Sequence, residues 1–362
     1  MTKQERVKAV IEGRKTDATP YHFDLTLKMK NRLADYYGIE TEEVEKFIGN
    51  HLLYLSFRTP ESFGRTEIRK EVAGKHESGT YTFDLEEVSQ DIYLDEFGVT
   101  WDNQKAYETG DWGMVDHPVK DMCLGAYKFP DGKARGRFRG VEAVVRQNPD
   151  RFNVLLMVGL LDTAWHVTGI QNLLQAMALE DSNFADKVLD LALEFNLGVI
   201  EQIPPYLDGV RFLEDWAGQQ GLFMSIKHWR RFLKPRLKEM YGAAKKRGCA
   251  VMSHSDGNIT ELFPELIELG VDVSDCLQPE VMDLAFIKKE YGKDIVLFGG
   301  LGCQSTIPRG TPEEVVKEAK ERLQLLGEGG KYILGPAGSI PTEAPIENVI
   351  ALVDFCQGLI GE

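Results

Sequence analysis

Short apolar runs alternate with helical patterns along the second half of the chain. Each run is followed by a segment in which apolar residues recur every three or four positions, as on one face of a helix. The strand-like runs are Gly209–Leu213, Cys249–Ser253, Val271–Cys276, Ile295–Phe298 and Tyr332–Leu334. The helical patterns lie near residues 227–247, 259–269, 281–291, 312–326 and 346–360. Strict alternation of this kind predicts a parallel sheet whose strands are connected by helices.

The first half of the chain adds further strand-like runs at Tyr21–Leu25, Leu52–Phe57 and Phe152–Val158. An eightfold barrel of strands and helices needs roughly 250 residues, so 362 residues accommodate one barrel and an excursion. We therefore predict an α/β fold, a (β/α)8 TIM barrel that forms a single domain over residues 1–362. A doubly wound open sheet is the alternative, but no strand-like run is followed by a glycine-rich phosphate-binding loop.

Two segments stand outside the alternation. Apolar residues with helical spacing before Gly13 predict a helical extension over residues 1–20. Within residues 64–140, Thr80–Leu85 alternates between apolar and polar positions, and Phe97–Trp101 follows a turn. This pattern predicts an inserted β-hairpin rather than another strand-helix unit.

Local signals predict where several helices begin or bend. Thr311 and Glu314 have the spacing of a capping box, with Pro312 at the first helical position. Ser225 is placed to cap the helix that follows it, while Pro235 inside that helix predicts a kink.

The chain is acidic, with a formal net charge of −15 and a pI of about 5.1. An acidic protein repels phosphate backbones, so we expect no nucleic acid as a partner; a basic patch on a protein partner is the better match. The longest apolar run, Val154–Leu161, is too short to span a bilayer, and the first residues carry no apolar signal sequence. These features predict a cytoplasmic protein. The five cysteines form no CxxC pair and are expected to be free thiols.

Ionisable side chains gather where the later strand-like runs end. In a barrel enzyme the carboxyl ends of the strands form the face that carries the active site. The candidates at these ends are Glu214, Asp215, His254, Asp256, Asp275, Cys303 and, just beyond the last run, Glu343. Each one alone has a structural explanation, such as a helix cap, a turn or a buried core side chain. All of them together on one rim favour an enzyme.

The residue types at this rim suit two kinds of chemistry. One histidine, several carboxylates and a thiol are donors that zinc accepts, and a catalytic zinc has three protein ligands and one open position. The sequence has neither a CxxC nor an HExxH spacing to support the metal. Without a metal, Glu214 and Asp215 are candidates for a general acid and a general base.

Several segments around these strand ends form a familiar set. They are Glu214–Gln219, Trp229–Pro235, His254–Ile259, Gly270–Asp272, Gln278–Glu280, Gly299-Gly300 with Gln304, Gly310–Val315 and Pro345–Asn348. With them the chain resembles the uroporphyrinogen decarboxylase superfamily, which includes cobalamin-dependent methyltransferases as well as the decarboxylase. The resemblance covers nearly the whole chain, and it implies a (β/α)8 barrel.

Two departures separate the chain from the decarboxylase itself. The decarboxylase grips the carboxylates of its substrate with an arginine-bearing N-terminal segment, whereas the matching segment here, Pro20–Leu25, has no arginine. The histidine of its C-terminal Gly-His-Gly motif corresponds to about Gly338. Carboxylates of such a substrate would be left unpaired, so decarboxylation is not the leading prediction.

Two methyltransferase branches imply different metal ligands. The thiol-methylating branch binds zinc through a His-x-Cys motif and a later cysteine, and His254 with Asp256 matches that set incompletely. The methyltransferase I components of corrinoid-dependent O-demethylases are more similar, and some bind zinc through an Asp, a Cys and a further donor. Asp275, Cys303 and Glu343 match these positions. Two ligand sets stay open: His254 and Asp256 with Cys303 or Glu343, and Asp275 with Cys303 and Glu343.

The resemblance to the O-demethylase components implies a methyltransferase of anaerobic metabolism with a small, methoxylated aromatic substrate. Zinc would act as a Lewis acid at the ether oxygen, and the methyl group would pass to cob(I)alamin, a cobalamin carried by a separate corrinoid protein. Glu214 or Asp215 would orient a ligand or protonate the leaving oxygen. The expected substrate-binding residues are Tyr21, His22, Phe23, Trp216 and Gln278.

The sequence is also compatible with two other functions. One is a metal-free lyase of the decarboxylase type that acts on a carboxylated substrate. The other is a protein that binds a corrinoid or a small molecule without catalysis. The sequence leaves open the methyl donor, the direction of transfer and the oligomeric state, for which a homodimer is one option.

Overall fold

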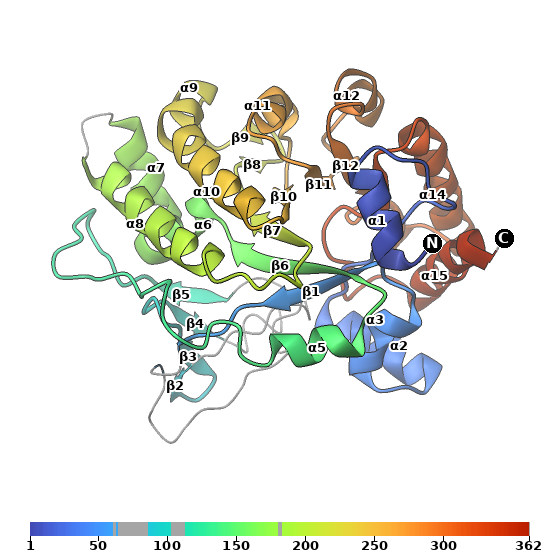
Figure 1. Cartoon of the computed structure of the whole chain (residues 1–362), viewed down its shortest axis with the longest axis horizontal. Coiled ribbons are helices and arrows are strands. Elements are labelled where there is room, and N and C mark those ends of the chain that lie inside the picture. Colours follow the sequence, from blue (N-terminus) through green and yellow to red (C-terminus); the bar gives the residue numbers. More distant parts are fainter. Residues whose placement is uncertain (61–62, 64–85, 103–112, 180–182, 362) are drawn as a thin grey trace.

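The computed structural model describes residues 1–60, 63, 86–102, 113–179 and 183–361. Its largest element is a curled sheet of seven parallel strands (Figure 1). In spatial order they are β1 (Leu52–Ser56), β6 (Phe152–Val158), β7 (Gly209–Leu213), β10 (Ala250–His254), β11 (Val273–Leu277), β12 (Val296–Leu301) and β13 (Tyr332–Pro336). Spatial order follows chain order, as expected when crossovers of one hand connect neighbouring parallel strands. The predicted α/β class with a parallel sheet is confirmed.

Residues 20–25 join the two edges of this sheet. On one side Tyr21 forms a parallel bridge with Leu334 of β13, and the amide of His22 donates to the carbonyl oxygen of Leu334 at 3.0 Å. On the other side the amide of His51, directly before β1, donates to the carbonyl oxygen of Tyr21 at 3.1 Å. The segment takes the place of an eighth strand, and the sheet curls round as a TIM-like barrel requires.

Helices lie on the outside of the strands (Figure 1). The longer ones are α1 (Lys3–Ile11), α2 (Leu27–Tyr37), α6 (Leu160–Thr168), α7 (Ile170–Ala178), α8 (Asn183–Ile200), α10 (Lys234–Lys246), α12 (Leu284–Tyr291), α14 (Pro312–Gly327) and α15 (Ile346–Gly361). The shorter ones are α3 (Val44–Phe47), α5 (Val141–Gln147), α9 (Ile226–His228), α11 (Phe263–Glu268) and α13 (Thr306–Arg309). Within the described ranges, none of these helices combines the length and the apolar character that a bilayer crossing requires.

The predicted helix signals are present in the structure. Thr311 accepts a hydrogen bond from the amide of Glu314, whose carboxylate accepts one from the amide of Thr311. Ser225 caps the first turn of α9. Pro235 lies in the first turn of α10, and a π-helical turn at Trp229–Leu233 precedes it. Pro235 therefore lies at the junction of two helix types, at the start of α10, rather than inside one continuous helix.

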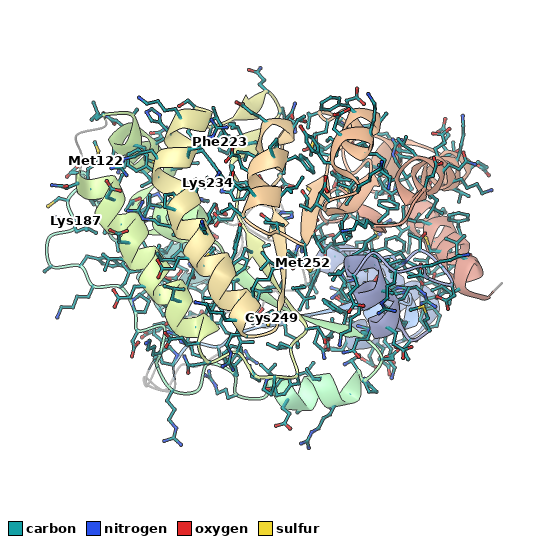
Figure 2. All side chains as sticks on the ribbon, turned by 45° about the horizontal axis from the view of Figure 1, so that its top comes forward. Met122, Lys187, Phe223, Lys234, Cys249 and Met252 are labelled. Atoms are coloured by element: carbon teal, nitrogen blue, oxygen red, sulfur yellow. The ribbon has the colours of Figure 1, made fainter. Side chains whose placement is uncertain are left out.

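The side chains of the strands divide between two cores, because successive residues of a strand point to opposite faces. Inward-directed side chains such as Tyr54, Leu156, Met252 and Phe298 fill the barrel interior, and Met252 is marked in Figure 2. Outward-directed side chains, for example Leu155, pack against the helices in a larger core. The interior is thus filled with side chains, and the functional site has to lie at one end of it.

A second sheet is inserted between β1 and β6. Its antiparallel strands are β2 (Glu86–Ser89), β3 (Ile92–Leu94), β4 (Thr100–Asp102) and β5 (Met114–Asp116). The alternation expected at Thr80–Leu85 lies outside the described residues. Tyr93, Val99 and Trp101 form a small core of this sheet, and the Trp101 ring lies 5.5 Å from that of His166 on α6. This contact joins the inserted sheet to the barrel.

Asn50 substitutes for a strand partner of Phe23. It is fully buried; its Oδ1 accepts a hydrogen bond from the amide of Phe23 at 2.9 Å, and its Nδ2 donates to the carbonyl oxygen of Phe23 at 3.0 Å.

Asn50→Ala would leave the backbone amide and carbonyl groups of Phe23 unpaired, so we expect the free energy of unfolding to fall by about 2 to 4 kcal/mol in chemical denaturation. Asn148→Ala, which removes an exposed bond to Val144, should cost less than about 0.5 kcal/mol. Equal effects would contradict the role given to Asn50.

Candidate active site

The site is built at the carboxyl ends of β7 and β10. Asp215 follows β7, His254 is the last residue of β10, and Asp256 lies two residues further along. One potential ligand atom from each residue lies within 4.8 Å of those of the other two. The amide of Asp256 donates to Oδ1 of Asp215 at 3.2 Å, which holds the two loops together. We call these three residues the rim cluster.

Two buried groups orient the ring of His254. Its Nδ1 lies 3.2 Å from Oδ2 of Asp275 and 3.0 Å from a guanidinium nitrogen of Arg211, and its Nε2 lies 3.9 Å from Asp256. A guanidinium only donates and a carboxylate only accepts, so a protonated Nδ1 donates to Asp275 and an unprotonated Nδ1 accepts from Arg211. Burial and Arg211 lower the pKa of His254, but Asp275 and Asp256 outweigh them, and the pKa rises to about 9.

Arg211 on β7 is the centre of an ion network inside the barrel. Its guanidinium pairs with Oδ2 of Asp24 at 3.0 Å and with Asp275, and it lies 4.9 Å from the centre of the Tyr54 ring. Burial alone would raise the pKa of both carboxyls, but the charge of Arg211 holds both pKa values below their usual range. Arg211 is not among the residues predicted from the sequence, although a single charge within the apolar run Gly209–Leu213 is a detectable signal.

Glu214 anchors a helix in this structure. Its fully buried carboxylate accepts hydrogen bonds from the amides of Leu160 (2.5 Å) and Leu161 (2.9 Å) at the N-terminus of α6. A Cβ atom at Gly159 would lie 2.3 Å from this carboxyl group, so only glycine leaves room for it. Burial, with the charge of Asp162 in addition, raises the pKa of Glu214 well above its usual value. The position of Glu214 suits support of α6, and its catalytic role stays a prediction.

Helix α6 brings a further carboxyl group, Asp162, to the rim. Its Oδ1 accepts hydrogen bonds from the indole N–H of Trp165 (2.9 Å) and from the amide of Asp215 (3.2 Å). Burial and the charge of Asp215 raise the pKa of Asp162 to about 8, and burial and Asp256 raise that of Asp215. Such neighbouring carboxyls titrate as one pair. The sequence analysis missed Asp162, whose signal is a lone carboxylate in the apolar stretch 154–164.

The alternative ligand set is not assembled within the described part of the chain. Asp275 is held in the ion network, Cys303 donates its thiol to the carbonyl oxygen of Gly338 at 3.7 Å, and Glu343 is exposed. No described group of donors within 4.8 Å of one another contains these three residues, and neither Cys303 nor Glu343 joins His254 in one. The structure brings Asp215 to His254 in their place.

Three of the expected substrate-binding residues are buried in the core, and their contact with a substrate stays a prediction. Alternate residues of an extended segment point to opposite faces, and Tyr21 and Phe23 point toward the helices. The hydroxyl group of Tyr21 donates to the carbonyl oxygen of Ile48 at 3.0 Å. Trp216 is fully buried, with its ring 5.7 Å from that of Trp229. None of the three side chains reaches the barrel mouth.

His22 and Gln278 are also buried, and they support other residues. Nε2 of His22 lies 3.3 Å from Oδ1 of Asp24, and its ring packs against Tyr54 at 4.5 Å, inside the barrel. Oε1 of Gln278 accepts a hydrogen bond from the amide of Gly257 at 3.1 Å and so fixes the loop that follows β10. Both positions suit residues that hold the site in place rather than ones that contact a substrate.

A thiol that the sequence analysis passed over lies beside the rim cluster. Sγ of Cys276, on β11, donates to Oδ1 of Asp256 at 3.0 Å. Burial and the charge of Asp256 raise the pKa of this thiol well above its usual value. Its only signal in the sequence is its place at the end of the run Val271–Cys276.

Ionisable donors at the carboxyl ends of a curled parallel sheet define the arrangement of an α/β-barrel enzyme. Residues 156–359, more than half of the chain, match the family model described as uroporphyrinogen decarboxylase (URO-D). The chain belongs to the URO-D family, and the resemblance seen in the sequence is confirmed.

Two curated relatives and one solved structure extend this result. The chain is 24% identical over 259 residues to a methylated-thiol–coenzyme M methyltransferase of Methanosarcina mazei, over 68% of this chain and 67% of the relative. It is 26% identical over 162 residues to a uroporphyrinogen decarboxylase of Chloroflexus aggregans, over 44% and 43%. A structure of a methyltransferase from Methanosarcina mazei superposes with a TM-score of 0.67 at 18% identity, over 99% of both chains, which shows the shared fold. The similarity to these enzymes supports the prediction of an enzyme.

Arg211→Met would leave Asp24 and Asp275 as buried carboxylates without their cation. We expect the free energy of unfolding at neutral pH to fall by about 3 to 5 kcal/mol in chemical denaturation. The matched control is Arg146→Met on α5, which removes an exposed ion pair with Glu142 and should cost less than about 0.5 kcal/mol. Unchanged stability of the Arg211 variant would show that the two carboxylates do not depend on this cation.

Proposed function

We propose that this protein is a corrinoid-dependent methyltransferase. It would take a methyl group from a small substrate and transfer it to the cobalamin of a separate corrinoid protein. The observation that carries the proposal is the rim cluster at the carboxyl ends of the strands in a URO-D-family fold. Similarity to the methylated-thiol–coenzyme M methyltransferase supports it. The resemblance of the late rim segments favours a methoxylated aromatic compound as the methyl donor.

The rim cluster fits a zinc ion. Asp215, His254 and Asp256 offer three donors within 4.8 Å, and the side chain of Asp256 is 59% exposed, which leaves a fourth position toward the mouth. The bond from Nδ1 of His254 to Asp275 is the kind of contact that orients histidine ligands of zinc. When bound, zinc would supply a Lewis acid at the heteroatom that carries the methyl group.

The carboxyl groups next to the cluster are suited to hold the proton that a leaving group takes up. Asp162 has a pKa of about 8, mainly through burial, and Asp215 shares that environment. Oδ1 of Asp215 accepts from the amide of Asp256, and this bond would hold the carboxylate in place as a metal ligand. Glu214 fixes α6 and thereby the position of Asp162. Asp215 would be a ligand of the metal, so we propose Asp162, which lies beside it, as the residue that protonates the leaving heteroatom.

The partner would dock over the barrel mouth. Cobalamin would supply the nucleophile that accepts the methyl group, and the exposed side of Asp256 marks where it has to approach. The net charge of −15 suits a basic patch on the corrinoid protein and a faster encounter with it.

A metal-free lyase that acts on a carboxylated substrate is the second candidate. Membership of the URO-D family and the similarity to a uroporphyrinogen decarboxylase favour it. The ion network speaks against it, because the charge of Arg211 is already balanced by Asp24 and Asp275. A carboxylated substrate would therefore find no free cation in Arg211.

His254→Ala and Asp256→Asn should each weaken zinc binding by at least about tenfold, because each removes one of three protein ligands. The measurement is zinc per chain by mass spectrometry after dialysis against a weak chelator. Asp354→Asn, on the exposed face of α15, is the matched control and should keep its zinc. Cys303→Ala distinguishes the two ligand sets: zinc lost in this variant but kept in His254→Ala would exclude the rim cluster.

Methyl transfer should require a corrinoid acceptor. With reduced cobalamin and a methyl donor, the absorbance of methylcobalamin should appear, and Asp162→Asn should slow its formation by about 10² to 10³-fold. Asp354→Asn should leave the rate unchanged. Release of product from substrate and protein alone would instead support the lyase.

A further inference from the structure

A cavity lies under the inserted sheet at the barrel mouth. Its walls come from the segment after β1, from the turn between β3 and β4, and from α6 and α8. The aromatic rings of the wall are those of Phe57, Phe97, Trp101 and Phe195. Val158, the last residue of β6, also lines the cavity and pairs with Leu213, two residues before Asp215. The cavity therefore lies beside the rim cluster, on the neighbouring strand.

Asp95 places a buried carboxylate in the wall of this cavity. Its Oδ1 accepts from the amides of Phe97 and Val99, both at 2.9 Å, and its Oδ2 accepts from the indole N–H of Trp101 at 2.9 Å. These partners among the described residues are uncharged, so they do not balance the charge of the carboxylate. Burial raises the pKa of Asp95 to about 7. A cation in the cavity would remove much of the cost of burying this charge.

Among the described residues, the other ionisable groups of the wall add no free positive charge. Glu96 forms an ion pair with Arg137 at 2.5 Å, and the guanidinium lies over the rings of Phe57 (5.7 Å) and Phe195 (5.1 Å). Burial and His117 lower the pKa of His166 to about 3, so this residue is uncharged at neutral pH. Two rings of the wall thus already contact one cation through their faces. The ring of Phe97 and the carboxylate of Asp95 form a setting that favours a second one.

We propose that this cavity binds an alkylated ammonium group of the substrate, while the methyl-bearing end of the same molecule reaches the rim cluster. Aromatic faces attract such a cation, and Asp95 supplies the opposite charge. The proposal rests on the proposed function and deepens it, because it adds a cationic group to the methyl donor. A neutral methoxylated aromatic compound would leave the charge of Asp95 unbalanced.

The test uses the full-length protein and tetramethylammonium chloride in isothermal titration calorimetry. We expect tetramethylammonium to bind at least tenfold more tightly than tert-butanol, which has a similar shape without the charge. Asp95→Asn should weaken tetramethylammonium at least tenfold and leave tert-butanol unchanged. Asp354→Asn, an exposed carboxylate far along the chain, should alter neither affinity.

A second variant guards against misfolding of the turn, because an amide group at position 95 faces the N–H of Trp101. Phe97→Leu keeps an apolar wall and the backbone N–H that bonds to Asp95 but removes an aromatic ring, and it should weaken tetramethylammonium at least threefold. Equal affinities for tetramethylammonium and tert-butanol, or binding of methoxybenzene but not of tetramethylammonium, would overturn the proposal. The titration needs neither metal nor corrinoid, so its failure and a failure of methyl transfer are read separately.

Discussion

The buried pairing of Arg211 with Asp24 and Asp275 is the interaction on which the rest of the molecule depends. One guanidinium on β7 reaches a carboxylate on residues 20–25 and another on β11, and its third contact is His254 on β10. Either carboxylate alone would be costly to bury, whereas the forked donors of one arginine satisfy both. The network therefore fixes the relative heights of strands that are far apart in the sequence.

The same ion network determines how the candidate site residue His254 is oriented. Asp275 is held by Arg211, so it presents a fixed oxygen to Nδ1 of His254 and turns the other ring nitrogen toward Asp256. Asp24 holds residues 20–25 in the barrel wall, where the sheet needs an eighth member to close. The rim cluster sits on short loops, but the ion network below it belongs to rigid strands. A site supported in this way can keep its donors in place without a bound ligand.

The strands and helices could be predicted from the sequence because short apolar runs and apolar residues with helical spacing are distinct patterns over most of the chain. The sequence could not predict which alternate residues of Tyr21–Leu25 face inward, since that depends on the partner supplied by Asn50 and on closure of the sheet. The resemblance to the O-demethylase components implied Asp275 as a metal ligand, but the sequence does not show that Asp275 has a partner inside the barrel. In the sequence, its partner Arg211 is only a single charged residue within an apolar strand. Its contacts with residues 20–25, β10 and β11 are seen only in the folded structure.

The candidate donors of the rim and the inserted part of the cavity wall lie in different parts of the chain. Asp162, Asp215, His254 and Asp256 all lie within residues 156–359, the part that matches the URO-D family. Asp95 and Trp101 lie outside that part, on a sheet inserted between β1 and β6. Because contacts such as Trp101 with His166 anchor the insertion to α6, a change in the inserted residues would reshape the cavity without moving the donors on the neighbouring strand ends. The family match thus covers the proposed reaction centre, while the inserted sheet supplies part of the wall of the proposed substrate cavity.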